Sequence, residues 1–346
     1  MRALFIVKRR YGYESNCESY SHEMRSGLYN SAKFVSSMLD RAGIHSTVVD
    51  VIDNNCIERE VVKYKATHVF IEALWVVPEK MRVLSFLYPN VKWIVRIHSN
   101  TPFIANEGIA IDWIKGYAEL GLSNVFIAPN SKSCLYDLSL IVPKDRLIYL
   151  PNYYQFSKKK HQTKHDDSIV KVGCFGSIRP LKNQLIQAIA AIGFADAINK
   201  KLEFHINSQR VEQRGNNALK NIRSLFKNSR HTLVEHEWLE HDAFLSVIGS
   251  MDINMQVSFT ETFNIVSADS VSQFVPVVVC SDISWVNKQF SASPIDTADI
   301  IAKMKKVFNS DRNQITSFNW LSLHSYNTVS KMVWLRYLHI WSSYGS

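Results

Sequence analysis

Short apolar runs alternate with amphipathic segments through the first half of the chain. The run Ala3–Lys8 has the length and composition of a strand, and apolar side chains recur on one helical face between Gly27 and Ala42. Further apolar runs predict strands at Ser46–Ile52, Thr67–Ala73, Lys92–His98, Asn124–Ala128 and Arg146–Leu150. Because strands that alternate with helices are joined by right-handed crossovers, we expect a parallel sheet.

A second alternation follows a polar interval at residues 153–168, whose lysines, histidines and aspartates are typical of a linker. Strands are predicted at Ile169–Phe175, Leu202–Asn207, His231–Glu235, Asp252–Val257 and Val275–Cys280. Residues 317–346 predict an aromatic-rich helical tail that packs against the body. The fold class is therefore α/β, with doubly wound domains at 1–152 and 169–316 that face a central cleft.

Composition narrows the class of protein. The 46% apolar and 12% aromatic fractions exclude a disordered chain. The segment Met1–Arg10 is interpreted as a first strand and not a signal peptide, and no apolar run has the length of a membrane span. Five scattered cysteines favour neither a disulfide framework nor a zinc knuckle, so a reducing, cytoplasmic setting is expected. The net charge of +9 favours a polyanionic partner, or it reflects an ordinary solvated basic surface.

The segment after the strand that ends near Val257 carries the first candidate chemistry. Glu261 lies in a short polar loop, and Asp269 follows eight positions later in a predicted helix that begins near Phe263 or Asn264. The amides of Phe263, Asn264 and Ile265 would be unpaired donors at the helix tip, where a phosphate can bind. The alternative is that both acids only stabilise the helix dipole.

A second constellation follows the strand that begins the second domain. A turn at Gly176 and Ser177 leads into Arg179 and Lys182, which stand three positions apart at a predicted helix start. Two fixed cations can neutralise the charge that develops on a departing pyrophosphate. The alternative is a helix start with solvated basic side chains.

Together these two segments resemble the retaining glycosyltransferases of the GT-B fold, the group 1 or EX7E-type family, which have two Rossmann-like domains. The resemblance implies that Glu261 contacts hydroxyls of the donor sugar and that Asp269 binds the nucleotide ribose. It also implies that Arg179, Lys182 and the helix-tip amides stabilise the leaving diphosphate, next to the turn at Gly176. The implied co-substrate is a nucleotide sugar, with UDP-sugars the commonest, and no further cofactor or metal is expected.

The chain departs from the family pattern at three positions. Asp269 stands where the family has a glutamate, Asn264 stands where glycine is common, and Phe274 replaces the glycine before Val275. Aspartate is one methylene shorter than glutamate, so the ribose contact is the carried-over role that these departures affect most.

The first domain holds weaker candidates. His98 follows a predicted strand, and the resemblance gives a histidine at such a position contact with the donor sugar or the acceptor; a structural histidine is the alternative. Asn100 and Glu107 are candidates on the acceptor side, as are Gly12 and Gly27 in the loop before the first helix.

An aromatic residue and a set of histidines are further candidates for binding. Trp238 follows a predicted strand and could stack on a nucleotide base or pack in the interior. Histidines 231, 236 and 241 recur every five residues, which suits no metal-binding face. The chain has no Asp-x-Asp, GxxxxGK[ST] or GxGxxG sequence, which disfavours metal-diphosphate transferases, P-loop NTPases and dinucleotide oxidoreductases.

The predicted activity is transfer of a sugar, with glucose from UDP-glucose the first choice, to an acceptor hydroxyl with retention. The segment Arg96–Gly108 and the basic charge resemble bacteriophage enzymes that glycosylate hydroxymethylated pyrimidines in DNA, so double-stranded DNA is a candidate partner. The alternatives are a surface polysaccharide or lipopolysaccharide glycosyltransferase held at acidic lipid, and a catalytically silent nucleic-acid-binding protein. The sugar and the oligomeric state stay open.

Overall fold

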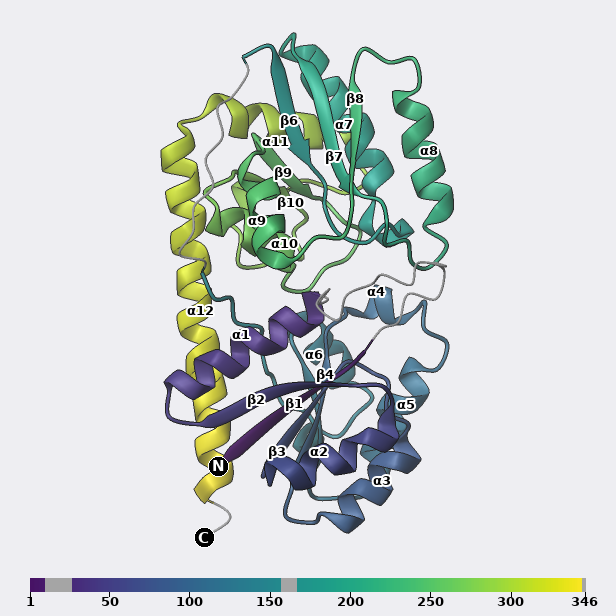
Figure 1. Cartoon of the computed structure of the whole chain (residues 1–346), viewed down its shortest axis with the longest axis vertical. Coiled ribbons are helices and arrows are strands. Elements are labelled where there is room, and N and C mark those ends of the chain that lie inside the picture. The colour runs from purple at the N-terminus through teal and green to yellow at the C-terminus, as the bar shows by residue number, and fades with distance from the viewer. Residues whose placement is uncertain (10–26, 157–166, 344–346) are drawn as a thin grey trace. The chain divides into compact units, whose positions relative to one another are not determined.

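A computed structural model describes residues 1–9, 27–156 and 167–343, with the side chains of 340–343 left aside. The described residues form two compact units: residues 1–9, 27–155 and 327–343 make up the first, and residues 156 and 167–326 make up the second. The last helix, α12 (Arg312–Ser343), contributes residues to both units. Each unit is an α/β body with its own sheet (Figure 1).

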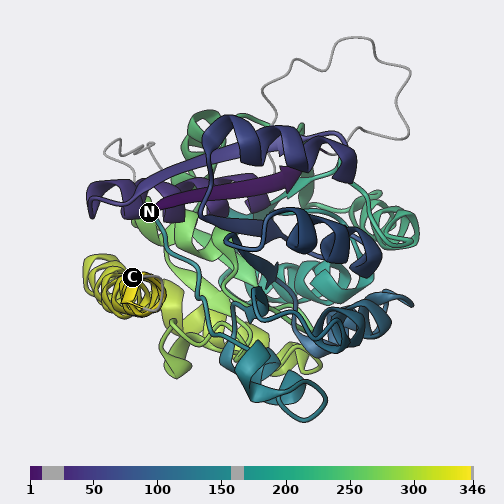
Figure 2. The same ribbon diagram turned by 90° about the horizontal axis from the view of Figure 1, so that it is seen from below.

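The first unit has a parallel sheet in the order β2-β1-β3-β4-β5, with β1 and β2 side by side in both ribbon views (Figures 1 and 2). This order is one of the two common doubly wound arrangements. Its elements are β1 (Arg2–Lys8), α1 (Gly27–Arg41), β2 (His45–Val51), α2 (Ile57–Tyr64), β3 (His68–Glu72), α3 (Pro78–Leu87), β4 (Lys92–Ile97), α4 (Thr101–Ile104), α5 (Ala110–Glu119), β5 (Val125–Pro129) and α6 (Lys132–Leu138).

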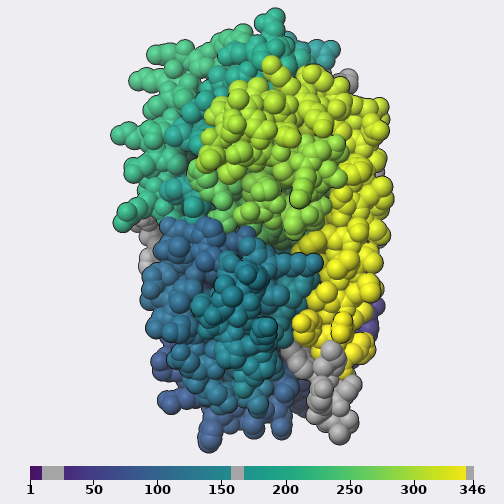
Figure 3. Space-filling view, turned by 180° about the vertical axis from the view of Figure 1, so that it is seen from behind, coloured from purple at the N-terminus to yellow at the C-terminus, as the bar shows by residue number. Residues whose placement is uncertain are grey.

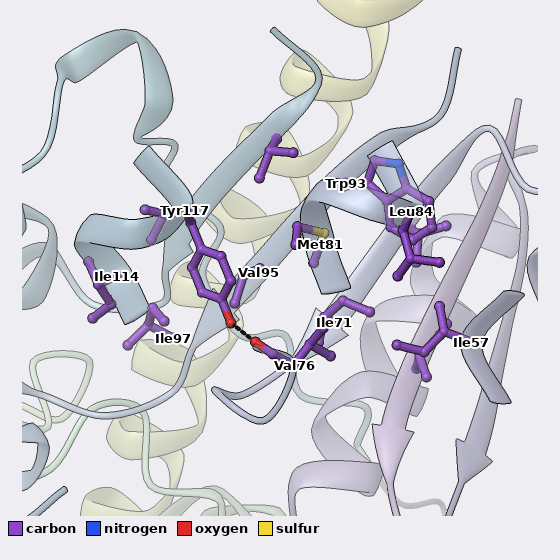
Figure 4. Packing of buried hydrophobic residues seen from close by; sticks show 14 of the residues in the cluster. Ile57, Ile71, Val76, Met81, Leu84, Trp93, Val95, Ile97, Ile114 and Tyr117 are labelled. Carbon is purple, nitrogen blue, oxygen red and sulfur yellow. Dashed lines mark hydrogen bonds between the residues drawn. The ribbon is translucent and has the colours of Figure 1, made fainter. Parts of the chain in front are cut away.

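Helices cover both faces of this sheet, which explains why its central strands are continuous apolar runs. On one face α2, α3, α5 and α6 pack over Trp93 and its neighbours, and the outer surfaces of this blue to teal part of the chain are visible in Figure 3. In this layer the Tyr117 hydroxyl donates to the carbonyl of Val76 (Figure 4). On the other face α1 packs together with Trp334 and Leu338 of α12.

The second unit has a parallel sheet in the order β10-β9-β6-β7-β8. Numbered from its own first strand, this is the classical dinucleotide-binding order 3-2-1-4-5, whose direction reverses between β6 and β9. Its elements are β6 (Ile169–Gly173), α7 (Gln184–Ala197), β7 (Lys201–Asn207), α8 (Asn216–Phe226), β8 (Thr232–His236), α9 (His241–Gly249), β9 (Ile253–Gln256), α10 (Ile265–Ser272), β10 (Val277–Val279) and α11 (Thr297–Asn309), with a 3-10 turn at Pro180–Lys182.

The predicted fold class, α/β with two doubly wound parallel sheets and a C-terminal helix, is confirmed. One predicted strand, Arg146–Leu150, is wrong. The Ile148 amide donates to Ile127 and the Leu150 amide to Pro129, but Pro129 has no amide proton to donate back. The ladder therefore stops at a single bridge. The tail helix begins at Arg312, five residues before the predicted start.

Gly173, the last residue of β6, is a position where no side chain fits. A Cβ atom there would lie 1.9 Å from Asn254 Oδ1 and 2.4 Å from the Phe175 ring. Gly173→Ala is expected to destabilise the protein by about 1–3 kcal/mol, since overpacking forces its neighbours to shift. Gly108→Ala is the control, because a Cβ at Gly108 meets nothing within 4 Å. The thermal unfolding midpoints of the two variants test this prediction, and equal midpoints would contradict the steric argument.

Candidate active site

The reversal point of the second sheet brings the two predicted constellations together. β6 leads into the turn that carries Arg179 and Lys182, and its neighbour β9 leads into the loop that carries Glu261. In open parallel sheets ligands bind beyond the carboxyl ends of the strands at such a reversal. The sheet order therefore places both segments at the position where a ligand is expected.

Lys182 and Glu261 are in direct contact: the Lys182 ammonium donates to Glu261 Oε1. Both side chains are largely buried, with 12% and 8% of their surfaces exposed. Two further bonds hold the turn against the loop, from the Phe259 amide to the Leu181 carbonyl at 3.0 Å and from Asn183 Nδ2 to the Val257 carbonyl at 3.0 Å. Hydrogen bonds to the backbone carbonyls of both segments thus hold the turn of Lys182 against the loop of Glu261.

Arg179 completes the charge pattern around this contact. Its Nη1 lies 3.6 Å from Glu212 Oε2, and the side chain is about one fifth exposed. Burial opposes ionisation of Glu261, but the charges of Lys182 and Arg179 hold its pKa below the usual carboxyl range. Glu261 is therefore a carboxylate at neutral pH.

The tip of α10 presents backbone donors beside the Glu261 loop. Asn264 caps the helix, and its Oδ1 accepts from the Ser267 amide at 2.8 Å. Within the described part of the chain, the amides of Phe263, Asn264 and Ile265 have no hydrogen-bond acceptor. Phe263 itself is buried, and its carbonyl accepts from Trp285 Nε1 at 2.7 Å. The three amides are suited to an anion.

Asn264 and Phe274, which depart from the family pattern, adopt the backbone conformation that favours glycine. Their φ angles are +55° and +57°, and Asn183, at the end of the Lys-Asn sequence, has φ +58°. Asparagine tolerates this region better than most residues, whereas phenylalanine is strained in it. The left-handed turns are thus present although glycine is absent.

Asp269 is engaged by a histidine. Its Oδ1 lies 2.8 Å from Nε2 of His241, the first residue of α9, and only 3% of the Asp269 side chain is exposed. His241 was considered in the sequence only as a metal ligand. The five-residue spacing of the histidines gave no indication that His241 would contact Asp269, because α9 and α10 come together only in the folded unit.

The remaining donor-side candidates line the same end of the sheet. Gly176 has φ +113°, and its amide donates to Asn207 Oδ1 at 3.0 Å. Ser177 is buried, with its carbonyl bonded to Gln184. Trp238 is partly exposed, and the Arg210 guanidinium lies 4.9 Å from its ring centre, so one ring face is already covered.

In the first unit, His98 belongs to a buried charge network that the sequence did not reveal. His98 Nε2 lies 2.5 Å from Glu72 Oε2, and Arg96 Nη1 lies 2.9 Å from Glu72 Oε1. Arg96 also donates to Asn152 at 3.0 Å, and its guanidinium lies 5.1 Å from the centre of the Trp334 ring. Burial lowers the pKa of His98, which is consistent with a neutral imidazole that donates to Glu72.

The other acceptor-side candidates lie on different elements of the first unit where the structure describes them. Asn100 is buried, and its Oδ1 accepts from the Ser131 hydroxyl at 2.5 Å. Glu107 is exposed on the turn after α4, and Gly27 is the first residue of α1. Gly12 lies outside the described residues.

The described residues contain neither a metal-binding cluster nor a membrane-spanning helix. No group of three or more histidine, cysteine, aspartate or glutamate side chains is placed to hold a metal ion there. Among the same residues, none of the helices combines the length and the apolar character needed to cross a bilayer.

Solved structures resemble the chain over nearly its whole length. OtsA in its apo form has a TM-score of 0.69 at 9% identity, with 99% of both chains covered. Sucrose-phosphate synthase from Thermosynechococcus elongatus has a TM-score of 0.69 at 11% identity and covers 99% of this chain and 100% of its own. Alr3699/HepE from Anabaena in complex with UDP has a TM-score of 0.62 at 12% identity, with 99% and 100% covered.

These are structures of GT-B glycosyltransferases. The chain has the GT-B fold. No protein-family model and no curated protein sequence matches it. At such low identities the likeness shows the fold of this chain, and its activity has to be argued from the side chains.

The Lys182–Glu261 contact gives a pH-dependent prediction. Since the pKa of Glu261 is lower in the folded than in the unfolded state, its contribution to stability is present above the ordinary carboxyl pKa, about 4.3, and is lost as the pH falls through the folded pKa. Lys182→Met leaves a buried carboxylate without its cation and is expected to cost about 3 kcal/mol at pH 7.5. The cost should shrink at pH 5, where the unpaired Glu261 takes up a proton.

Urea unfolding at both pH values measures this difference. The double variant Lys182→Met/Glu261→Gln should recover part of the lost stability, because no charge is left buried. Lys220→Met, on the exposed face of α8, is the matched control. A penalty for Lys182→Met that is the same at pH 5 and pH 7.5 would contradict the ion-pair argument.

Proposed function

We propose that the chain is a retaining glycosyltransferase that transfers a sugar, glucose from UDP-glucose in the first instance, to an acceptor hydroxyl. The observation that carries the proposal is the buried Lys182–Glu261 contact at the reversal point of the second sheet, beside the tip of α10. Support comes from solved structures of the same fold, since HepE is described in complex with UDP and with UDP-glucose. A further neighbour is described in connection with glycosyl transfer with retention.

In this proposal the donor diphosphate binds at the amides of the α10 tip. The bond between the anomeric carbon and the phosphate oxygen breaks, and Arg179 and Lys182 neutralise the charge that develops on the leaving group. The acceptor hydroxyl forms its bond on the same face and gives its proton to the departing phosphate oxygen. The protein mainly positions the reactants and stabilises charge.

Glu261 and Lys182 exchange partners when the donor binds. Before binding, each charge is balanced by the other in a site with little exposure to water. Donor hydroxyls then donate to Glu261, while the Lys182 ammonium turns to the diphosphate. The contact with Lys182 keeps Glu261 ionised in the absence of donor, so this carboxyl group need not lose a proton before the donor binds.

The acceptor in this proposal is a hydroxymethylated pyrimidine in bacteriophage DNA, reached in the host cytoplasm. The net charge of +9 supports a polyanionic acceptor. His98, Asn100 and Glu107 remain the proposed acceptor-side residues. A surface polysaccharide acceptor near acidic lipid is the alternative enzyme function, and a silent nucleic-acid-binding protein would have no use for the Lys182–Glu261 pair.

Substitution of the proposed donor-site charges tests the activity. Glu261→Gln, Arg179→Ala and Lys182→Ala are each expected to lower sugar transfer or UDP-glucose hydrolysis by about 100-fold or more, since each removes a charge from the reacting centre. The measurement is release of UDP from UDP-glucose, with circular dichroism to show that each variant is folded. Lys220→Ala, an exposed lysine of α8, should retain full activity. Wild-type turnover in any of the three variants removes that residue from the mechanism.

The acceptor class is tested by binding at several salt concentrations. Affinity for a duplex that contains hydroxymethylated pyrimidines should fall steeply and linearly in a log–log plot against salt, because bound counterions are released. Fluorescence anisotropy with a labelled duplex gives the slope. Co-sedimentation with acidic vesicles, without duplex binding at low salt, would instead favour the polysaccharide acceptor.

A further inference from the structure

His241 is the more exposed member of its contact with Asp269. Its Nε2 is 2.8 Å from Asp269 Oδ1, and 24% of the imidazole is exposed against 3% of the carboxylate. More of the histidine ring than of the carboxylate is therefore available to a ligand at this face.

The pair lies close to the anion-binding tip of α10. Asp269 is four residues past Ile265, the first residue of the helix, which corresponds to about 6 Å along its axis. In a nucleoside diphosphate the ribose is joined directly to the phosphates. A diphosphate at the tip therefore brings the ribose hydroxyls within reach of groups in this part of α10 and α9.

We propose that His241, held in place by Asp269, makes the ribose contact in this chain. The inference rests on the proposed function, because it assigns the nucleotide part of the same donor site. His241 is the ribose-binding residue and Asp269 is a positioning residue that fixes the ring through Nε2. The imidazole extends the site toward the ribose, which compensates for an aspartate side chain that is shorter than glutamate.

The charge of the pair supports this arrangement. Burial lowers the pKa of His241, but the hydrogen bond and charge of Asp269, together with Asp242 and Glu240, raise it above the usual value. A raised pKa favours the protonated ring, in which both ring nitrogens carry a proton, so that one can donate to Asp269 and the other to a ribose oxygen.

Apolar residues from α9, α10 and their neighbouring segments form one buried cluster: Phe175, Ile248, Met251, Val275, Phe244, Val247 and Val266. The charged groups that raise the pKa of the His241 ring are Asp269 from α10 and two acids of its own segment, Asp242 and Glu240.

Binding of nucleotides that differ only in the ribose tests the proposal. Wild-type protein is titrated with UDP, ADP and GDP by calorimetry, and the tightest of these is then compared with its 2′-deoxy and 3′-deoxy forms. The wild type is expected to prefer the ribose form over one deoxy form by about tenfold, as expected for a hydrogen bond to a charged group. His241→Ala should weaken the ribose form by a similar factor and bind all three forms alike.

His241→Gln is the matched variant. Its side-chain amide can still donate to Asp269, so folding is preserved while the second ring nitrogen is lost; it should show the same loss of discrimination. Nuclear magnetic resonance of the His241 ring should show nucleotide-induced shifts, and Asp269→Asn should lower the ring pKa.

The outcomes separate the two claims. Retained discrimination in His241→Ala and His241→Gln would overturn the ribose assignment alone, because Asp269 would then make the contact. Failure of wild-type protein to bind any of the three nucleotides would overturn the proposed function and the ribose assignment together.

Discussion

A buried pair of opposite charges at the reversal point of a parallel sheet organises the second unit. Lys182 and Glu261 come from segments about eighty residues apart, and only the adjacency of β6 and β9 brings them together. Removal of two charges from water is costly, and a buried ion pair contributes little to stability after that cost. The proposed donor site requires one charge for a diphosphate and one for a sugar. This requirement gives the pair a function that stability alone does not explain.

The backbone of this site is kept although its glycines are not. Asn183, Asn264 and Phe274 all have φ near +57°, where side chains other than glycine cost about 1 kcal/mol or more. Asn264 offsets this cost in part because its side chain also caps α10. Left-handed turns at this site are thus formed in this chain by residues other than glycine.

The sequence was sufficient for every predicted strand except Arg146–Leu150, because a strand depends largely on local pattern. The sequence was insufficient to identify which side chains the charged residues contact. Glu72 ends an apolar run and was assigned only to a strand, although Arg96 and His98 bond to it. These contacts depend on strand order, which one sequence does not display. The prediction at Arg146–Leu150 failed for a related reason, since a strand also needs a neighbour that can donate back.

The buried charged side chains indicate which part of the chain carries the positive charge. Among the described residues the buried charged side chains are Arg96, with the largely buried Lys182, on the basic side and Glu60, Glu72, Glu261 and Asp269 on the acidic side. The interior is therefore acidic on balance, and the net charge of +9 must be carried by side chains at the surface or in the segments outside the described residues. A surface that is more basic than the whole chain attracts polyanions at long range.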